Sequence, residues 1–387
     1  MAAAGSGLST LPGAADAALD ASLAALAAAG CDHADVAFVF VTGDAHAEAH
    51  ALLHAVRRVT GARAVVGCSG AGVLTDQREV ESETAVAVLA VRDDRLNAMP
   101  FLIDDLAAAG DDTGPRIARR VAETVFQGGC VMLMPDVRGL DARGLLGRLD
   151  DALGFVPVVG AVAAGMPLFE LFNTDAADGA LVGLAVAGEE PTIGVAQGCM
   201  PIGEPFVITR AEENVVHTIG SRPALEILKQ AIETLPDAQA RVQRAGVFAG
   251  LAMDPAKSPL TRGDFLVRNL AGIDPSSGAI AVAEHVKVGQ TIQFQIRDAR
   301  AAREDLDATL AHVAATLGGR RPLFGCYFNC AGRGRGLFGV PDHDVTLIRD
   351  RLGDFPLAGF FGNGEFAPIG RRNFFHNYTS ALVLFPA

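Results

Sequence analysis

The chain has 387 residues, more than one ordinary hydrophobic core holds, and this length predicts two α/β domains or two fused halves. Half of the residues are apolar and 20% are charged, a balance typical of a folded chain. The formal net charge of −13 argues against binding to nucleic acid or to an anionic membrane, which attract clustered Lys and Arg.

Several sequence features bear on location and on thiol chemistry. No Lys or Arg precedes Arg57, and the apolar runs are far shorter than the roughly 18–20 residues that cross a bilayer. We therefore expect a cytoplasmic protein without membrane insertion. The six cysteines are scattered, which favours reduced thiols. Cys326 and Cys330 are close in sequence, but no second Cys pair or nearby His completes a zinc site, so no metal is expected.

The first half of the chain alternates helices and strands. Residues 1–33 form a predicted helical extension, in which 14–29 is an Ala-rich helix. Hydrophobic periodicity then predicts helices over 45–59, 117–126 and 143–153, and strands over 35–41, 64–68, 84–91, 97–103, 130–134, 156–159, 180–187 and 192–197. We expect the strands over 84–91 and 97–103 to pair antiparallel.

The second half continues in the same manner after a domain boundary that we place near residue 220. Residues 34–220 and 221–387 are thus the two predicted α/β domains. Residues 235–244 are polar and predict a connection. Helices are expected over 224–234, 299–317 and 343–352, and strands over 246–251, 265–270, 291–296, 323–328, 357–361 and 375–385. The pattern predicts a mixed α/β (α+β) fold, with two fused α/β halves whose mixed sheets are flanked by helices.

A G-x-x-x-x-G step follows an apolar strand three times, at Gly67 to Gly72, Gly160 to Gly165 and Gly359 to Gly364. Each strand itself follows an amphipathic helix, which makes the three copies comparable. Glycine at a strand end supplies positive φ and lets backbone N–H groups converge on a ligand. Tight packing of the turn is the alternative explanation.

Sequence motifs of common enzymes match poorly. Cys68 and Ser69 end a predicted strand, but Ala71 stands where a nucleophile elbow needs glycine, and no local base accompanies them. None of the three glycine steps is followed by the Lys of a phosphate loop. Gly334 to Gly339 satisfies G-x-G-x-x-G, but these glycines end before the next predicted helix, unlike the dinucleotide-binding fingerprint.

The C-terminal segment carries the side chains best suited to a small ligand. Arg333 offers a planar fork for a carboxylate, and Glu365 can hold an ammonium. Backbone N–H groups of Gly362, Asn363 and Gly364 can complete an anion cradle. The alternative is an ion pair between Arg333 and Glu365.

Two further side chains in this segment have an inert and an active interpretation. Cys330 lies in a Gly- and Arg-rich loop whose positive charge favours a reactive thiolate, whereas a buried, inert thiol is the alternative. His376 lies among aromatic residues of the last strand, as a core histidine does. Its alternative role is that of a pH-sensitive or metal-binding imidazole.

These stretches resemble the C-terminal half of FIST proteins. The matching segments are Phe328 to Gly334, Phe355 to Glu365 and Phe375 to Thr379, similar to an aromatic-x-Cys-x-Gly-Arg-Gly step, a Gly-Phe-Phe-Gly-x-Gly-Glu turn and a His-x-Tyr-Thr strand. Gln197 to Gly203 and Gly220 to Leu225 are also similar, although Met200 replaces the usual Arg. The resemblance covers residues 35–385.

The resemblance implies a bacterial-type sensory module that binds a small metabolite, such as an amino acid, and reports to a separate signalling protein such as a histidine kinase. We expect a glycine-rich cleft between the halves and no catalytic residue. The candidate ligand-binding residues are Gly67, Cys68, Ser69, Gly160, Cys330, Arg333, Gly362, Asn363, Gly364, Glu365 and His376.

Two other functions stay open at this point. Some stand-alone members of the family are regarded as haem-binding nitric oxide sensors, and His376, His217 and His285 are candidate axial ligands, although Cys-x-x-Cys-His is absent. The other function is a cysteine hydrolase that uses Cys68 or Cys330. Our leading interpretation requires no cofactor.

Overall fold

The structure is a computed structural model that describes residues 2–81, 83–126, 128–188, 190–254 and 256–387. Its contacts divide the chain into two compact units. Unit 1 comprises Met1–Val195, Asp307–Phe375 and Thr379–Ala387, and unit 2 comprises Ala196–Leu306 and His376–Tyr378. The units are therefore not continuous stretches of the chain, because unit 1 contains segments from before and after residue 220.

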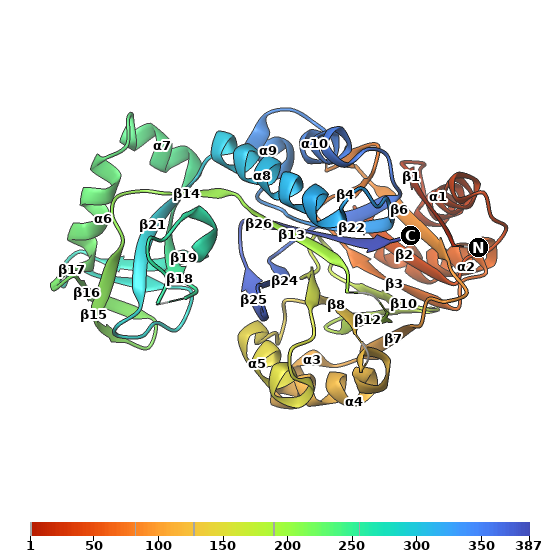
Figure 1. The fold of residues 1–387 in the computed structure, drawn as a ribbon, viewed down its shortest axis with the longest axis horizontal. Coiled ribbons are helices and arrows are strands. Elements are labelled where there is room, and N and C mark those ends of the chain that lie inside the picture. The colour runs from red at the N-terminus through yellow and green to blue at the C-terminus, as the bar shows by residue number, and fades with distance from the viewer. Residues whose placement is uncertain (1, 82, 127, 189, 255) are drawn as a thin grey trace. The chain divides into compact units, whose positions relative to one another are not determined.

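Unit 1 contains most of three repeats of one element order: strand, helix, strand, helix, strand, hairpin, strand (Figure 1). The first repeat consists of β1 (Ala3–Ser9), α1 (Ala14–Ala29), β2 (Val36–Thr42), η1 (His46–Glu48), α2 (Ala49–Thr60), β3 (Ala64–Ser69), the hairpin β4 (Val73–Thr75) and β5 (Glu79–Val80), and β6 (Ala85–Arg92).

The second repeat consists of β7 (Ala98–Ile103), α3 (Leu106–Ala109), η2 (Gly110–Asp112), α4 (Thr113–Val125), β8 (Gly129–Pro135), α5 (Ala142–Leu153), β9 (Val158–Ala161), the hairpin β10 (Glu170–Phe172) and β11 (Asp175–Ala177), and β12 (Leu181–Ala187). The third consists of β13 (Thr192–Gln197), α8 (Ala299–Leu317), β22 (Pro322–Cys330), α9 (Gly334–Phe338), α10 (His343–Leu352), β23 (Leu357–Gly362), the hairpin β24 (Glu365–Ile369) and β25 (Arg372–His376), and β26 (Thr379–Pro386).

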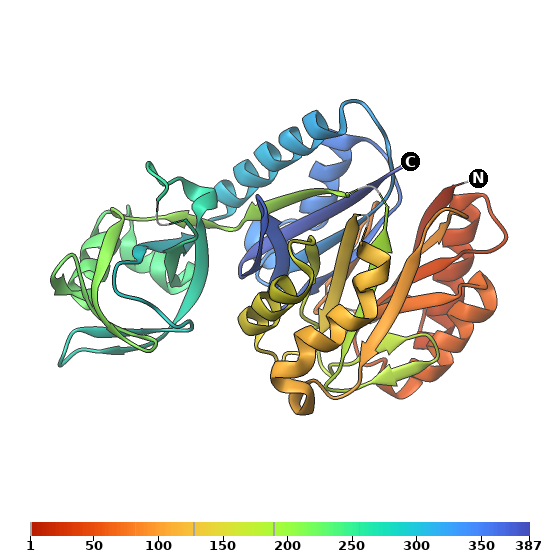
Figure 2. The same cartoon turned by 60° about the horizontal axis from the view of Figure 1, so that its bottom comes forward.

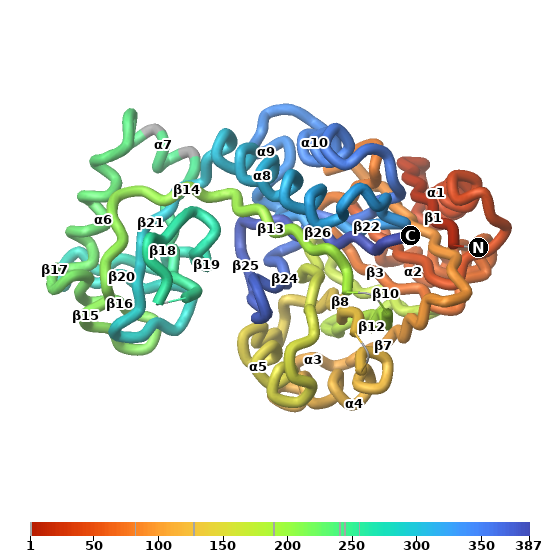
Figure 3. Tube along the Cα trace, viewed as in Figure 1, coloured from red at the N-terminus to blue at the C-terminus, as the bar shows by residue number. Residues whose placement is uncertain are grey.

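The hairpins link the repeats, because each pairs with the sheet of a different repeat. The three sheet orders are β1-β6-β2-β3-β10-β11, β7-β12-β8-β9-β24-β25 and β13-β26-β22-β23-β4-β5. In each sheet the third and fourth strands are parallel. Figure 3 shows the blue hairpin β24–β25, whose first strand pairs with β9 of the second repeat.

The three sheets share one apolar core, and helices cover their other faces. Phe38, Met132, Phe328 and Phe360 belong to this shared core. Helices α1 and α2 bury their apolar side chains against the first sheet, and α4 and α5 do so against the second. Figure 2 shows the gold and yellow helices α4 and α5 in front of their strands. Burial on both faces explains why the central strands are continuously apolar.

The first glycine of each G-x-x-x-x-G step occupies the same position in each repeat. A Cβ added to Gly67, Gly160 or Gly359 would lie 1.7, 2.0 or 1.8 Å from a backbone carbonyl oxygen of the neighbouring parallel strand. Only glycine allows this approach. Close packing between strands therefore explains these three glycines.

Unit 2 is a small barrel. Its strands are β14 (Cys199–Pro201), β15 (Phe206–Glu212), β16 (Val215–Ile219), β17 (Arg222–Pro223), β18 (Val247–Ala252), β19 (Phe265–Asp274), β20 (Ala279–Val282) and β21 (Thr291–Arg297). The order β21-β15-β16-β20-β19-β18 closes because β18 also pairs with β21. Helix α6 (Ala224–Glu233) contributes to the apolar core, and α7 (Ala238–Ala245) and η3 (Arg262–Asp264) complete the unit.

The mixed α/β fold is confirmed, with three local corrections. Strands β6 and β7 do not pair, because β6 lies between β1 and β2 whereas β7 pairs with β12. The expected connection over 235–244 is largely the helix α7. The expected strand over 375–385 is interrupted, because Tyr378 has a φ of 59°. No helix in the described part of the chain is long and apolar enough to cross a membrane.

Candidate functional site

Arg333 is the central charged side chain of the candidate site. It follows the end of β22, and only 2% of the residue is exposed. Its Nε lies 3.0 Å from Asp344 Oδ2, and its Nη2 lies 3.2 Å from Asp344 Oδ1. Arg333 therefore forms a bidentate ion pair with Asp344, and not the ion pair with Glu365 that was the alternative from the sequence. Asp344 is the partner of Arg333 because it lies in the first turn of α10 with its carboxylate buried.

Polar groups surround the Asp344 carboxylate. The Tyr327 hydroxyl and the Asn329 amide nitrogen donate to its Oδ2 at 3.0 and 3.1 Å. His343 Nδ1 lies 2.8 Å from Oδ1. Burial alone would raise the pKa of Asp344, but the charge of Arg333 and the hydrogen bonds from His343 and Arg333 together outweigh burial and hold this pKa well below its usual range. Both groups of the pair are therefore ionised at neutral pH.

Glu365 begins β24 and is completely buried. Its Oε2 accepts the Thr379 N–H at 3.3 Å, and the Cys330 side chain and the Gly364 backbone also hydrogen bond to the carboxyl group, although no partner is found for Oε1 among the described residues. Burial raises the pKa of Glu365 well above its usual range. Burial therefore favours the neutral form of this carboxyl group. Arg333 Nη1 likewise lacks a partner within the described part of the chain.

The hairpin of the first repeat supports this site. Glu79 Oε1 accepts the N–H groups of Asp344 and Val345 at 3.1 and 3.0 Å. A carboxylate at the first turn of a helix is favoured by the unpaired N–H groups there. Burial, followed by the charge of Asp344, nevertheless raises the pKa of Glu79 to about 8. Further along, Glu81 Oε1 accepts the Arg335 N–H at 2.9 Å.

The predicted glycine cradle is only partly available to a ligand. The Asn363 N–H donates to Val162 O at 2.9 Å, so this amide is not free for an anion. Gly364 hydrogen bonds through its backbone to the Glu365 carboxyl. Gly160, in β9, pairs with Phe366 beside Glu365. Cys330 is 8% exposed, and its Sγ accepts the Gly332 N–H at 3.4 Å.

The other predicted binding residues lie elsewhere. Gly67, Cys68 and Ser69 belong to β3, and Cys68 pairs with Glu170 of the second repeat. Burial raises the pKa of the Cys68 thiol, which disfavours the thiolate a nucleophile needs. Ser69 Oγ accepts the Phe169 N–H at 3.1 Å. His376 ends β25 and groups with unit 2; all other predicted binding residues lie in unit 1.

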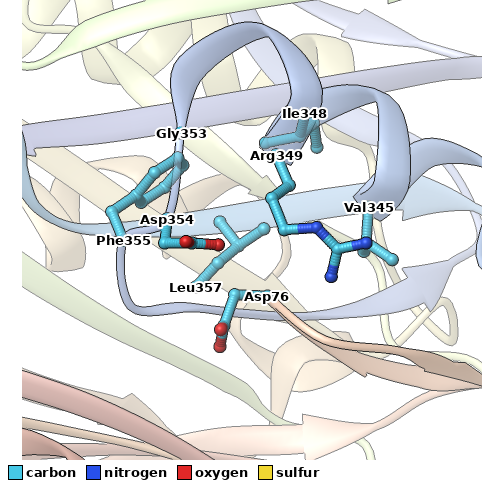
Figure 4. Close-up of a pocket in the computed structure, with 8 residues that line it drawn as sticks. All are labelled: Asp76, Val345, Ile348, Arg349, Gly353, Asp354, Phe355 and Leu357. Atoms are coloured by element: carbon cyan, nitrogen blue, oxygen red, sulfur yellow. The ribbon is translucent and has the colours of Figure 1, made fainter.

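A small cavity lies beside α10. Figure 4 shows Val345, Ile348 and Arg349 of this helix around it, together with Asp76 and the turn before β23. The cavity volume is about 10 Å³. This is about the minimum for one water molecule. The cavity does not include Arg333 or Glu365, and it is too small for an amino acid.

Sequence reasoning missed Asp344, Tyr327 and Glu79, the residues that position Arg333. Asp344 had a detectable signal, because it precedes Ile348 by four residues and so lies on the apolar face of the predicted helix over 343–352. Glu79 had no such signal, because its role depends on a hairpin that pairs with a distant strand: Thr75 pairs with Ala358, 283 residues later in the chain.

Comparisons with known proteins define the class to which this arrangement belongs. The FIST N domain matches residues 35–222, and the FIST C domain matches residues 224–368. The chain belongs to the FIST family, whose domains are associated with sensory and signal transduction modules.

Its relatives include an uncharacterized protein of Mycobacterium tuberculosis (strain ATCC 25618 / H37Rv), 37% identical over 86% of this chain and 86% of the relative. An uncharacterized protein of Mycobacterium bovis (strain ATCC BAA-935 / AF2122/97) is 35% identical over 95% of this chain and 96% of the relative. Among solved structures, a chorismatase is similar with a TM-score of 0.35 and 10% identity, covering 100% of this chain and 99% of that one.

Proposed function

We propose that the protein is a sensor that binds a small metabolite with a carboxylate and an ammonium group, such as an amino acid, between Arg333 and Glu365. One observation carries the proposal: Arg333 Nη1 and Glu365 Oε1 are both buried, and both lack a partner among the described residues. An unsatisfied buried polar group costs about 1–3 kcal/mol. A ligand that satisfies both atoms recovers this free energy.

The two groups suit the two ends of an amino acid. Asp344 fixes the guanidinium of Arg333 through Nε and Nη2, and this leaves Nη1 to donate to a carboxylate. Burial favours the neutral form of Glu365 in the free protein, and the carboxyl becomes a charged acceptor for an ammonium group once it loses its proton. Binding of an ammonium group therefore releases a proton from Glu365 at neutral pH.

Entry of the ligand requires a local movement, because Arg333 and Glu365 are 2% and 0% exposed. The short helix α9 directly follows Arg333 and ends at Phe338, before Gly339, which has a φ of 76°. We place the movement in α9. A movement that favours the ligand-bound state provides the signal, which a separate protein such as a histidine kinase receives.

A panel of amino acids, their α-keto acid analogues and nucleotides tests this proposal by thermal shift. We expect at least one amino acid to raise the melting temperature in a concentration-dependent manner. The matched control is Glu365→Gln, which imitates the neutral carboxyl and should fold normally but cannot ionise. Absence of any shift in the panel, or an equal shift in Glu365→Gln, contradicts the proposal.

A further inference from the structure

Glu170 occupies in the second repeat the position that Glu365 occupies in the third. Each is the first residue of its hairpin, and each pairs with the residue after the strand glycine, Cys68 after Gly67 and Ala161 after Gly160. The Ala180 N–H donates to Glu170 Oε2 at 3.2 Å, as the Thr379 N–H does to Glu365 Oε2. Glu170 is also completely buried, and its Oε1 has no partner among the described residues.

Asp136 places a second carboxylate beside Glu170. Its Oδ2 accepts the Gly179 N–H at 3.3 Å, and the next amide along the chain, that of Ala180, binds Glu170. The Asp136 side chain is 0% exposed. Two consecutive amides thus bind two buried carboxyl groups, which are near enough for the charge of Asp136 to raise the pKa of Glu170.

The chain's own Arg138 already shows which ligand chemistry Asp136 accepts. Arg138 Nε lies 3.0 and 3.1 Å from the two Asp136 oxygens, and its Nη2 also contacts Asp136 and Asp178. The Arg138 side chain is 53% exposed, so it can leave toward solvent without crossing the core. It does not hydrogen bond to Glu170 in the described structure, where Oε1 stays unsatisfied.

We infer that Asp136 and Glu170 form a second binding site, for a small cation that carries a guanidinium group, and that Arg138 occupies part of this site in the free protein. The guanidinium group of the ligand takes the place of the Arg138 guanidinium on Asp136 and also hydrogen bonds to Glu170 Oε1. Burial and the charge of Asp136 raise the pKa of Glu170 to about 9, and an added cation favours ionisation of this carboxyl. This inference is independent of the proposed function, which concerns Arg333 and Glu365.

The test uses methylguanidinium as the probe and the full chain with Arg138→Ala, which vacates the site. We expect saturable binding by calorimetry, weaker binding of ethylammonium, and none of tetramethylammonium, which has no N–H donor. Wild-type protein should bind methylguanidinium more weakly than Arg138→Ala, because Arg138 competes. Arg138→Gln, which keeps much of the side-chain stem, is the second variant if Arg138→Ala is unstable.

Two double variants locate the probe. Adding Glu170→Gln to Arg138→Ala should weaken methylguanidinium binding by about tenfold. Adding the equivalent Glu365→Gln should leave it unchanged, which separates this site from that of the proposed function. The inference is overturned if neither Arg138 variant binds the probe saturably, or if Glu170→Gln has no effect.

Discussion

Arg333 and Asp344 form a buried two-point ion pair in which each side chain is 1% exposed. Removing one partner of a buried pair leaves the other charge without compensation. We predict that Asp344→Asn lowers the free energy of unfolding by about 3–5 kcal/mol, measured by urea denaturation. The matched control is Asp307→Asn, which removes an exposed pair with Arg351 and should cost about 0–1 kcal/mol. Equal losses for the two variants would show that the Arg333–Asp344 pair is not needed for stability.

The glycines that face neighbouring strands give a second prediction. Gly359→Ala places a Cβ 1.8 Å from Tyr327 O, so the parallel strands must separate. We expect a loss of about 1–3 kcal/mol or more in unfolding free energy. Gly147→Ala is the control, because Gly147 lies in α5 with no atom within 4 Å of its added Cβ, and it should gain up to about 1 kcal/mol. A neutral Gly359→Ala variant contradicts the described strand contact.

The raised pKa of Glu170 predicts how the free energy of unfolding depends on pH. Its pKa is about 9 in the folded protein against an ordinary value of 4.5, mainly because of burial. The folded state therefore retains a proton that the unfolded state loses, and stability falls as the pH rises from about 4.5 to 9. Glu170→Gln removes this contribution, which is up to about 1.4 kcal/mol per pH unit. Denaturation curves over pH 5–9 should show a shallower decline in the variant; parallel declines would contradict the assignment.

Thiol burial predicts an order of chemical modification. Cys31 is partly exposed, whereas Cys68, Cys130 and Cys326 are completely buried. Burial raises the pKa of Cys130 to about 12 and also raises that of Cys68. We expect iodoacetamide to label Cys31 in the native protein and to label these three thiols only after unfolding. Mass spectrometry of the labelled peptides gives the result, and rapid native labelling of Cys68 contradicts it.

Local elements were more predictable from sequence than their arrangement. The helices over 14–29, 299–317 and 343–352 follow from hydrophobic periodicity and have the predicted bounds. Strand β1 was missed because its small residues show weak alternation, although Gly5 and Gly7 are needed where α1 lies against the strand. The hairpin exchange between repeats depends on pairing between distant segments, which periodicity does not report.

The candidate site was predictable in part for the same reason. Arg333 and Glu365 were found from their motifs, and both are buried in the third repeat. Their neighbours were not, because Glu79 reaches Asp344 only through the exchanged hairpin. The sequence analysis placed Cys68 and Glu365 in one site. In the structure Cys68 pairs with Glu170, which occupies in the second repeat the position that Glu365 occupies in the third.

Proton release on binding tests the central claim most directly. Titration calorimetry with the amino acid that gives the largest thermal shift, repeated at pH 7 in two buffers of different ionisation enthalpy, measures the protons released. Because burial favours the neutral form of Glu365 before binding and an ammonium group favours its ionised form after binding, we predict release of about one proton per ligand by the wild type and none by Glu365→Gln, with binding weaker by about tenfold. Equal affinity and equal proton release in the two proteins would contradict a site between Arg333 and Glu365.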